Sequence, residues 1–178
     1  VNFYPFENTI LKTKNESKII ENIDIGGPAL VRSAAKNFKD VVVITSNEQL
    51  DNLASEMNIN NGSTSLKFRK NLSQEAFNET AYYDSNISKY FNKINDNRFP
   101  KKITINGSLV NKLRYGENPH QLGAIYSRNN LNELEKLNGK ELSYNNYNDI
   151  YYGLDIINSL PKGIGTIIIK HANPSGVS

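Results

Sequence analysis

Residues 41–44 (VVVI) form an apolar β-branched run directly after a segment with helical character. Gly26-Gly27 predicts a turn, and Pro28 suits the first position of a helix that we expect to end at Asp40. Continuous β-branched runs are typical of strands covered on both faces, which occur mainly in parallel sheets. The succession of helix and buried strand therefore favours an α/β fold.

Apolar residues at helical spacing predict further helices in the first half of the chain. Segment 18–22 has the character of the end of a short helix, and Ser46 with Gln49 matches a capping box for a helix reaching about Met57. Between residues 64 and 91 the apolar side chains keep a roughly helical spacing. This region is predicted to form one or two long amphipathic helices.

The pattern changes after the polar stretch 92–97 and Pro100, and we place a domain boundary between there and Gly107. Beyond it, a helix is predicted over 149–160 and a turn over 173–176. Short apolar segments predict strands, the last of them buried, at 102–105, 109–113, 124–126 and 165–169.

The composition of the 178 residues excludes several classes of protein. The absence of cysteine excludes a disulfide scaffold, a thiolate metal site and a Cys nucleophile, and it makes the reducing cytoplasm the expected location. A net charge of +3 is too small to indicate a nucleic-acid partner. No apolar run approaches the ~18 residues of a membrane span.

The predicted helix start at Gly26 and Gly27 is the first candidate site. Backbone N–H groups at a helix N-terminus attract anions, and the helix dipole adds to this attraction. Arg32 and Lys36 stand four residues apart on one helical face, and Asp24 lies just upstream, where it could pair with Lys36 or move a proton. The same residues also fit a plain turn, a solvated helix face and a helix cap.

A polar loop, residues 114–121 (RYGENPHQ), follows a predicted strand and is the second candidate. It contains Arg114, Tyr115 and His120, and His120 is one of only 2 histidines in the chain. Loops carry functional residues more often than regular elements do. The loop is therefore a candidate for ligand binding, with an idle solvent-facing histidine as the alternative.

Lys170 and His171 end the last predicted strand and form the third candidate. Ligands of open α/β sheets bind at the carboxyl ends of strands. A neighbouring cation favours the neutral imidazole, which accepts protons near neutral pH. Neighbours on a strand face opposite ways, so both side chains reach one ligand only if the predicted turn at 173–176 redirects the backbone. A charged strand end before a turn is the alternative.

Six strings occur in this order and at these spacings in one enzyme family: NFYPF, IDIGGPALVRSAAKN, TSLxFRKNL, LRYGENPHQ, NGKELSYNNxND and KHANPSGV. From end to end, the chain resembles the bifunctional enzymes that combine phosphoribosylaminoimidazolecarboxamide (AICAR) formyltransferase with IMP cyclohydrolase. The bacterial pattern more often reads KHANPCG, so Ser175 replaces a cysteine at a position to which we assign no chemistry.

The resemblance implies an α/β fold in two parts. Residues 1–106 resemble the later part of a methylglyoxal-synthase-like cyclohydrolase domain with a helical linker, and 107–178 resemble the beginning of a cytidine-deaminase-like transformylase domain. The family's enzymes are much longer, so we expect an internal fragment that is inactive alone.

The resemblance also implies the partners of the full-length enzyme. We expect a cytoplasmic homodimer that binds AICAR, its formylated product FAICAR and IMP, and that binds neither nucleic acid nor membranes. The expected co-substrate is 10-formyltetrahydrofolate, and no metal is expected.

For the cyclohydrolase, the resemblance implies that Tyr4, Asp24 and Lys36 surround the reacting groups, with Gly26 and Gly27 near the nucleotide. In this reaction the carboxamide nitrogen attacks the formyl carbon and water is lost. Asp24 would accept the proton and Lys36 would stabilise the developing charge.

For the formyl transfer, the resemblance implies that Lys170 and His171 are the catalytic pair and that His120 supports them. His171 would take the proton of the substrate amine while Lys170 stabilises charge on the formyl oxygen. Three residues are implied to contact the nucleotide: Arg114, Tyr115 and Asn145.

A function of a different class also fits Gly26-Gly27: a nucleotide- or phosphate-sensing regulatory module with a methylglyoxal-synthase-like fold. Such a sensor has no need for Lys170-His171 together with Arg114-Tyr115, and these residues distinguish the two hypotheses.

Overall fold

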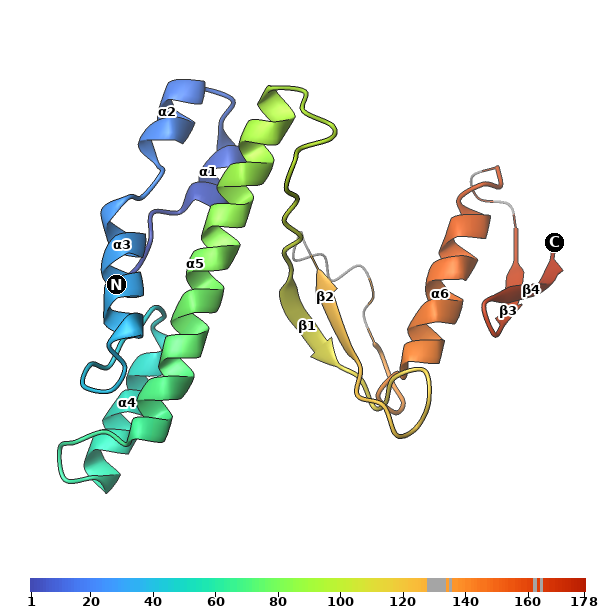
Figure 1. Cartoon of the computed structure of the whole chain (residues 1–178). Helices are drawn as coiled ribbons and strands as arrows, with labels where there is room; N and C mark the ends of the chain where they lie inside the picture. The colour runs from blue at the N-terminus through green and yellow to red at the C-terminus, as the bar shows by residue number, and fades with distance from the viewer. Residues whose placement is uncertain (128–133, 135, 162, 164) are drawn as a thin grey trace. The chain divides into compact units, whose positions relative to one another are not determined.

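The computed structural model describes residues 1–127, 134, 136–161, 163 and 165–178. The chain divides into two compact units, Val1–Asn106 (unit 1) and Gly107–Ser178 (unit 2). The sequence predicts a domain boundary between Pro100 and Gly107, and the assignment of the two units to two enzyme domains stays a prediction. Helices and strands both occur, as expected for an α/β chain (Figure 1).

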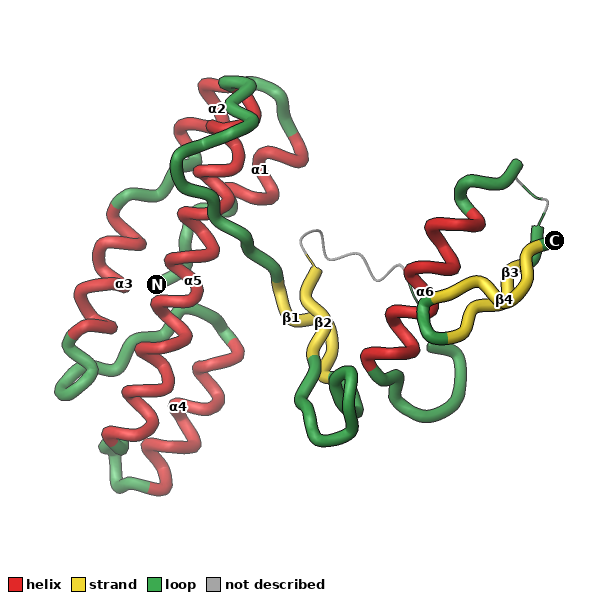
Figure 2. Tube along the Cα trace, turned by 45° about the vertical axis from the view of Figure 1, so that its right-hand side comes forward, coloured by secondary structure: helices red, strands yellow, loops and turns green. Residues whose placement is uncertain are grey.

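Unit 1 consists of helices and loops, and the short helices lie along the longest one (Figures 1 and 2). The predicted short helix ending near residue 22 and the long helix after residue 64 are both confirmed, and the long helix is single. The helices are α1 (Phe6–Lys12), α2 (Glu16–Glu21), α3 (Gly26–Lys36), α4 (Glu48–Ile59) and α5 (Leu66–Ile94).

Two hydrophobic clusters stabilise unit 1. In the first, Val31 and Ala35 of α3 pack with Leu72 and Ala76 of α5. Each pair is spaced by four residues, which places both members on one face of its helix. The second cluster joins α1, α2 and α5 through three side chains: Phe6, Ile19 and Tyr83.

The strand predicted at residues 41–44 is wrong. Val41 donates its N–H to the Asn37 carbonyl at 3.0 Å, and Ile44 accepts from the Val1 amino group at 2.8 Å. A strand needs a neighbouring strand for its hydrogen bonds, and the described part of unit 1 contains none. Val43 packs instead into the first hydrophobic cluster.

The helices on either side of this segment also differ from the predicted bounds. Helix α3 begins at Gly26 and ends at Lys36, so it starts before Pro28 and stops short of Asp40. Helix α4 begins at Glu48, and the glutamine half of the predicted capping box is formed, because Gln49 Oε1 accepts the N–H of Ser46 at 3.3 Å.

Unit 2 contains two separate β-hairpins and one helix. Strand β1 (Ser108–Lys112) pairs antiparallel with β2 (Ala124–Ser127), and β3 (Ile167–Lys170) pairs antiparallel with β4 (Asn173–Val177). Helix α6 (Tyr144–Ile157) packs against β3. The strands predicted at 109–113 and 124–126 are confirmed.

Three predictions for this region are wrong. Residues 102–105 form no strand, and Ile103 and Ile105 are each 76% exposed. Helix α6 starts at Tyr144 rather than 149, because Ser143 and Asn146 form a capping box there. Strand β3 is not buried, since Ile168 is 63% exposed.

The position of the last turn also differs from the prediction. Residues 173–176 belong to strand β4, and the chain reverses at His171 and Ala172 instead. The described residues contain no helix that is both long and apolar enough to cross a membrane.

Candidate functional site

Asp24 caps the start of helix α3. Its Oδ1 accepts the N–H of Gly27 at 2.7 Å, and its Oδ2 accepts the N–H of Tyr4 at 3.2 Å. A Cβ on Gly27 would lie 2.5 Å from Asp24 Oδ2, so any larger residue at this position would displace the Asp24 carboxylate. The carboxylate therefore occupies the helix N-terminus where the sequence suggests an anion site.

Tyr83 supports this cap from α5. Its hydroxyl accepts the Asp24 N–H at 2.8 Å and donates to the Asn22 carbonyl at 3.2 Å. Burial raises the pKa of Tyr83, and the negative charge of Asp24 raises it further. The hydrogen bond from the Asp24 N–H lowers this pKa, but by less than burial raises it. The phenol thus stays protonated and keeps donating to Asn22.

Lys36 lies at the opposite end of α3 from Asp24. The helix has 11 residues, which corresponds to about 16 Å at the α-helical rise. The direct pair between Asp24 and Lys36 that the sequence suggested is therefore not formed. Lys36 and Arg32 are exposed, as expected for a solvated helix face.

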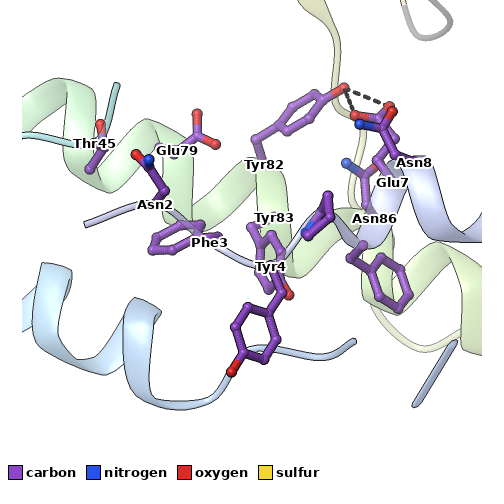
Figure 3. Close-up of a pocket in the computed structure, with 12 residues that line it drawn as sticks. Asn2, Phe3, Tyr4, Glu7, Asn8, Thr45, Glu79, Tyr82, Tyr83 and Asn86 are labelled. Carbon is purple, nitrogen blue, oxygen red and sulfur yellow. Dashed lines mark hydrogen bonds between the residues drawn. The ribbon is translucent and has the colours of Figure 1, made fainter. Parts of the chain in front are cut away.

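A pocket of about 290 Å³ in unit 1 includes Tyr4 among its lining residues (Figure 3). Tyr82 donates its hydroxyl to Glu7 at 3.1 Å, and the Tyr4 ring points away from this pair. Desolvation, and then the charge of Glu7, raise the pKa of Glu79. None of the other residues predicted for the cyclohydrolase lines the pocket, so it does not assemble that site.

The loop after β1 closes tightly on itself. Gly116 donates to the Gln121 carbonyl at 2.8 Å, and Gln121 Oε1 accepts the Asn118 N–H at 2.8 Å. A Cβ on Gly116 would lie 2.9 Å from the Cβ of Gln121, so a larger residue would force the loop open. This close approach accounts for the glycine in the RYGENPHQ string.

Arg114 and Tyr115 interact at the start of this loop. The Arg114 guanidinium carbon lies 4.8 Å from the Tyr115 ring centroid, and Arg114 Nη2 donates to the Tyr115 hydroxyl at 3.0 Å. The hydrogen bond from Arg114, a second one with Ser143 and the charge of Arg114 lower the pKa of Tyr115. The two residues implied to bind the nucleotide thus form one polar group.

The start of α6 is joined to the same loop. Tyr144 donates its N–H to the Tyr115 carbonyl at 3.2 Å, and Asn145 Nδ2 donates to the Glu117 carbonyl at 3.0 Å. The structure therefore brings together three of the predicted nucleotide contacts, Arg114, Tyr115 and Asn145, although 30 sequence positions separate Asn145 from Tyr115.

One turn further along α6, Asp149 holds the reversal between β3 and β4. Its Oδ1 accepts the Ala172 N–H at 2.7 Å. Asn145 and Asp149 are four residues apart and share one helix face. This face contacts both the loop that contains Arg114 and the turn that contains His171, so two predicted motifs meet at a single helix.

Gly153 lies on the same face one turn further along, where α6 packs against β3. A Cβ at Gly153 would lie 3.4 Å from Ile169 Cγ1, which is an ordinary contact distance. The strand that carries Lys170 therefore packs closely against α6.

Other predicted residues are not brought together. In the described part of the chain, the side chains of His120 and Lys170 form no hydrogen bond or ion pair, and both residues are exposed. Among the described residues, no hydrogen bond or ion pair joins His120 to Lys170 or His171, so the predicted supporting role of His120 stays a prediction.

Sequence reasoning missed Ser143 and Asp149. The S-x-x-N spacing signals the first as a helix cap, and the position of Asp149, four residues after Asn145, places it on the same face.

Comparisons with known proteins place the chain in one family. Residues 34–178 match the family model of the AICARFT/IMPCHase bienzyme. The chain is 43% identical over 184 residues to the bifunctional purine biosynthesis protein PurH of Bradyrhizobium diazoefficiens and 45% identical over 180 residues to that of Leptospira biflexa. In both cases 100% of this chain is covered, but it spans only 35% of the relative's length. The chain belongs to the AICARFT/IMPCHase bienzyme family.

Proposed function

We propose that the protein carries out the last two steps of IMP synthesis in its full-length form. The first step transfers a formyl group from 10-formyltetrahydrofolate to the amine of AICAR, and the second closes FAICAR to IMP with loss of water. Residues 107–178 would contribute to the first site as the beginning of a cytidine-deaminase-like domain. Residues 1–106 would contribute to the second as the later part of a methylglyoxal-synthase-like domain.

The observation that carries the formyl-transfer proposal is the face of helix α6. Asn145 binds the Glu117 carbonyl at 3.0 Å, and Asp149 binds the Ala172 N–H at 2.7 Å. The Arg114-Tyr115 loop and the Lys170-His171 turn are therefore attached to one helix within one turn of each other. Formyl transfer would require these two motifs to lie near the same nucleotide. Such convergence of polar groups from distant segments supports a ligand site.

In this proposal, the amine nitrogen of AICAR attacks the formyl carbon and forms the new C–N bond. The His171 imidazole accepts the proton that the amine loses, and Lys170 stabilises the negative charge on the formyl oxygen. The bond to the folate nitrogen then breaks, and that nitrogen takes up a proton. Arg114, Tyr115 and Asn145 hold the nucleotide.

The cyclohydrolase assignment draws its support from Asp24, whose carboxylate binds the N–H groups of both Tyr4 and Gly27. Tyr4 is thereby held at the start of α3, beside the glycines proposed to approach the nucleotide. Lys36, at the other end of α3, would act on a different part of the ligand than Asp24 does. The sensor alternative gains no support, because the family comparisons point to the bienzyme.

A single variant tests the catalytic assignment. In a protein of full family length that carries these residues, His171→Ala is expected to lower kcat for formyl transfer by about 10²–10⁴-fold, because the proton acceptor is lost. Closure of added FAICAR should continue at its normal rate. The control is Ser175→Ala in the adjacent strand β4, which should transfer formyl normally. Formyl transfer at the normal rate by His171→Ala would refute the assignment.

In the same proposal the protein is a cytoplasmic homodimer without a metal requirement, and neither site is complete within the 178 residues.

A further inference from the structure

The turn that contains His171 adopts an unfavourable backbone conformation. His171 has φ 53° and Ala172 has φ 59°, so both central residues of the β3–β4 hairpin lie in the left-handed region. Turns of this kind favour Asn, Asp and Gly, which tolerate positive φ. The conformation is unfavourable for alanine and, although less rare for histidine, it persists at two consecutive residues only when surrounding contacts enforce it. The turn therefore needs support from outside itself.

Asp149 supplies that support from helix α6. Its Oδ1 accepts the Ala172 N–H at 2.7 Å, at the short end of the range for N–H···O hydrogen bonds. On the other side of the turn, Asn173 Nδ2 donates to the His171 carbonyl at 2.9 Å. The peptide group between His171 and Ala172 is thus held at both its oxygen and its nitrogen.

The anchor is itself fixed in place. Helix α6 begins with the capping box of Ser143, and it packs against β3 at Gly153, one turn beyond Asp149. Asp149 therefore connects a capped helix to a strained turn, and its position decides where the turn lies.

We propose that Asp149 is a positioning residue for formyl transfer, holding the backbone of His171 in the left-handed conformation from which the imidazole and the Lys170 amine reach the substrate. The inference rests on the proposed function of His171 and adds to it. Asp149 takes no part in bond making; it acts through the Ala172 N–H.

Kinetics of the full-length protein test this role. Asp149→Ala is expected to lower kcat for formyl transfer by about 10- to 100-fold, the effect of displacing a reacting group by about an ångström. The KM for AICAR should change less than about threefold, because Arg114, Tyr115 and Asn145 stay in place. Closure of added FAICAR should be unaffected. The matched control is Asp155→Ala, which removes an exposed carboxylate from the same helix and should leave kcat unchanged.

Rescue separates positioning from general damage. Asp149→Asn keeps an acceptor oxygen and should restore most of kcat. Adding Ala172→Gly to Asp149→Ala should restore part of it, because glycine adopts positive φ without steric cost. If Asp149→Ala does not fold, Asp149→Asn and the double variant carry the test through the same KM and kcat measurements.

An unchanged kcat in Asp149→Ala, a loss confined to KM, or a loss that neither change rescues would each overturn the proposal. His171→Ala, assayed alongside, separates the two levels of inference. Normal formyl transfer in His171→Ala refutes the proposed catalytic assignment. An inactive His171→Ala with a fully active Asp149→Ala refutes only the positioning role.

Discussion

The two units of the chain are stabilised by different forces. In the described residues every buried hydrophobic side chain lies in unit 1: Phe6, Ile19, Val31, Ala35, Val43, Leu72, Ala76 and Tyr83. Unit 2 exposes apolar strand residues such as Tyr126, at 65%, and Ile168, at 63%. Its loops are held by hydrogen bonds from α6 to Glu117 and Ala172.

The two units should therefore respond differently to substitution. Burial of a large apolar side chain stabilises by several kcal/mol, whereas a single hydrogen bond contributes about 1 kcal/mol. A substitution in the core of unit 1 should therefore disturb the whole unit. A substitution in the hydrogen-bond network of unit 2 should act locally, on the loops that carry the candidate site.

Phe6→Ala should give the largest effect. Phe6 is 1% exposed and packs with Ile19 and Tyr83, so its removal should lower the free energy of unfolding of unit 1 by about 3–5 kcal/mol. Amide hydrogen exchange along α5 measures the change. Leu11→Ala on the same helix is the control: Leu11 is 80% exposed, and its loss should change the free energy by less than about 0.5 kcal/mol. Equal effects of the two substitutions would contradict the hydrophobic account of unit 1.

Ser143→Ala should give a smaller, more local effect. Loss of the α6 cap costs about 1 kcal/mol, or about fivefold faster amide exchange. Because Tyr144 and Asn145 hold the loop of residues 114–121, exchange should rise in that loop as well. Ser65→Ala removes the corresponding cap of α5, and its effect should stay within the first turn. A loop unchanged in Ser143→Ala would show that α6 does not hold it.

The regular elements were predictable where the signal was long. Helix α5 follows from apolar spacing sustained over many residues, and the short strands β1 and β2 from their local patterns. The strand predicted at residues 41–44 was wrong because β-branched side chains only favour extended backbone, whereas a strand also needs a neighbouring strand for its hydrogen bonds. Helix ends moved with capping contacts, as at Ser143, where a few residues decide the boundary.

The candidate site was predictable in its motifs and not in its connections. The strings around Arg114, Asn145 and His171 stand out in the sequence, but their attachment to one helix depends on how α6 packs against the hairpin. The position of the turn at His171 and Ala172 was missed because Pro174, Ser175 and Gly176 carry the stronger turn signal and Ala172 is not typical of positive φ. The separation of Asp24 from Lys36, which lie at opposite ends of α3, likewise could be predicted only once the bounds of this helix were known.

The most direct test of the proposed formyl-transfer site is a crystal structure of a full-length protein carrying these residues with AICAR bound. The nucleotide should lie against the α6 face, contacted by Arg114 and Asn145, with its amine about 3 Å from the His171 imidazole, within hydrogen-bond reach. Density for AICAR with its amine away from the β3–β4 turn, and His171 contacting solvent alone, would contradict it.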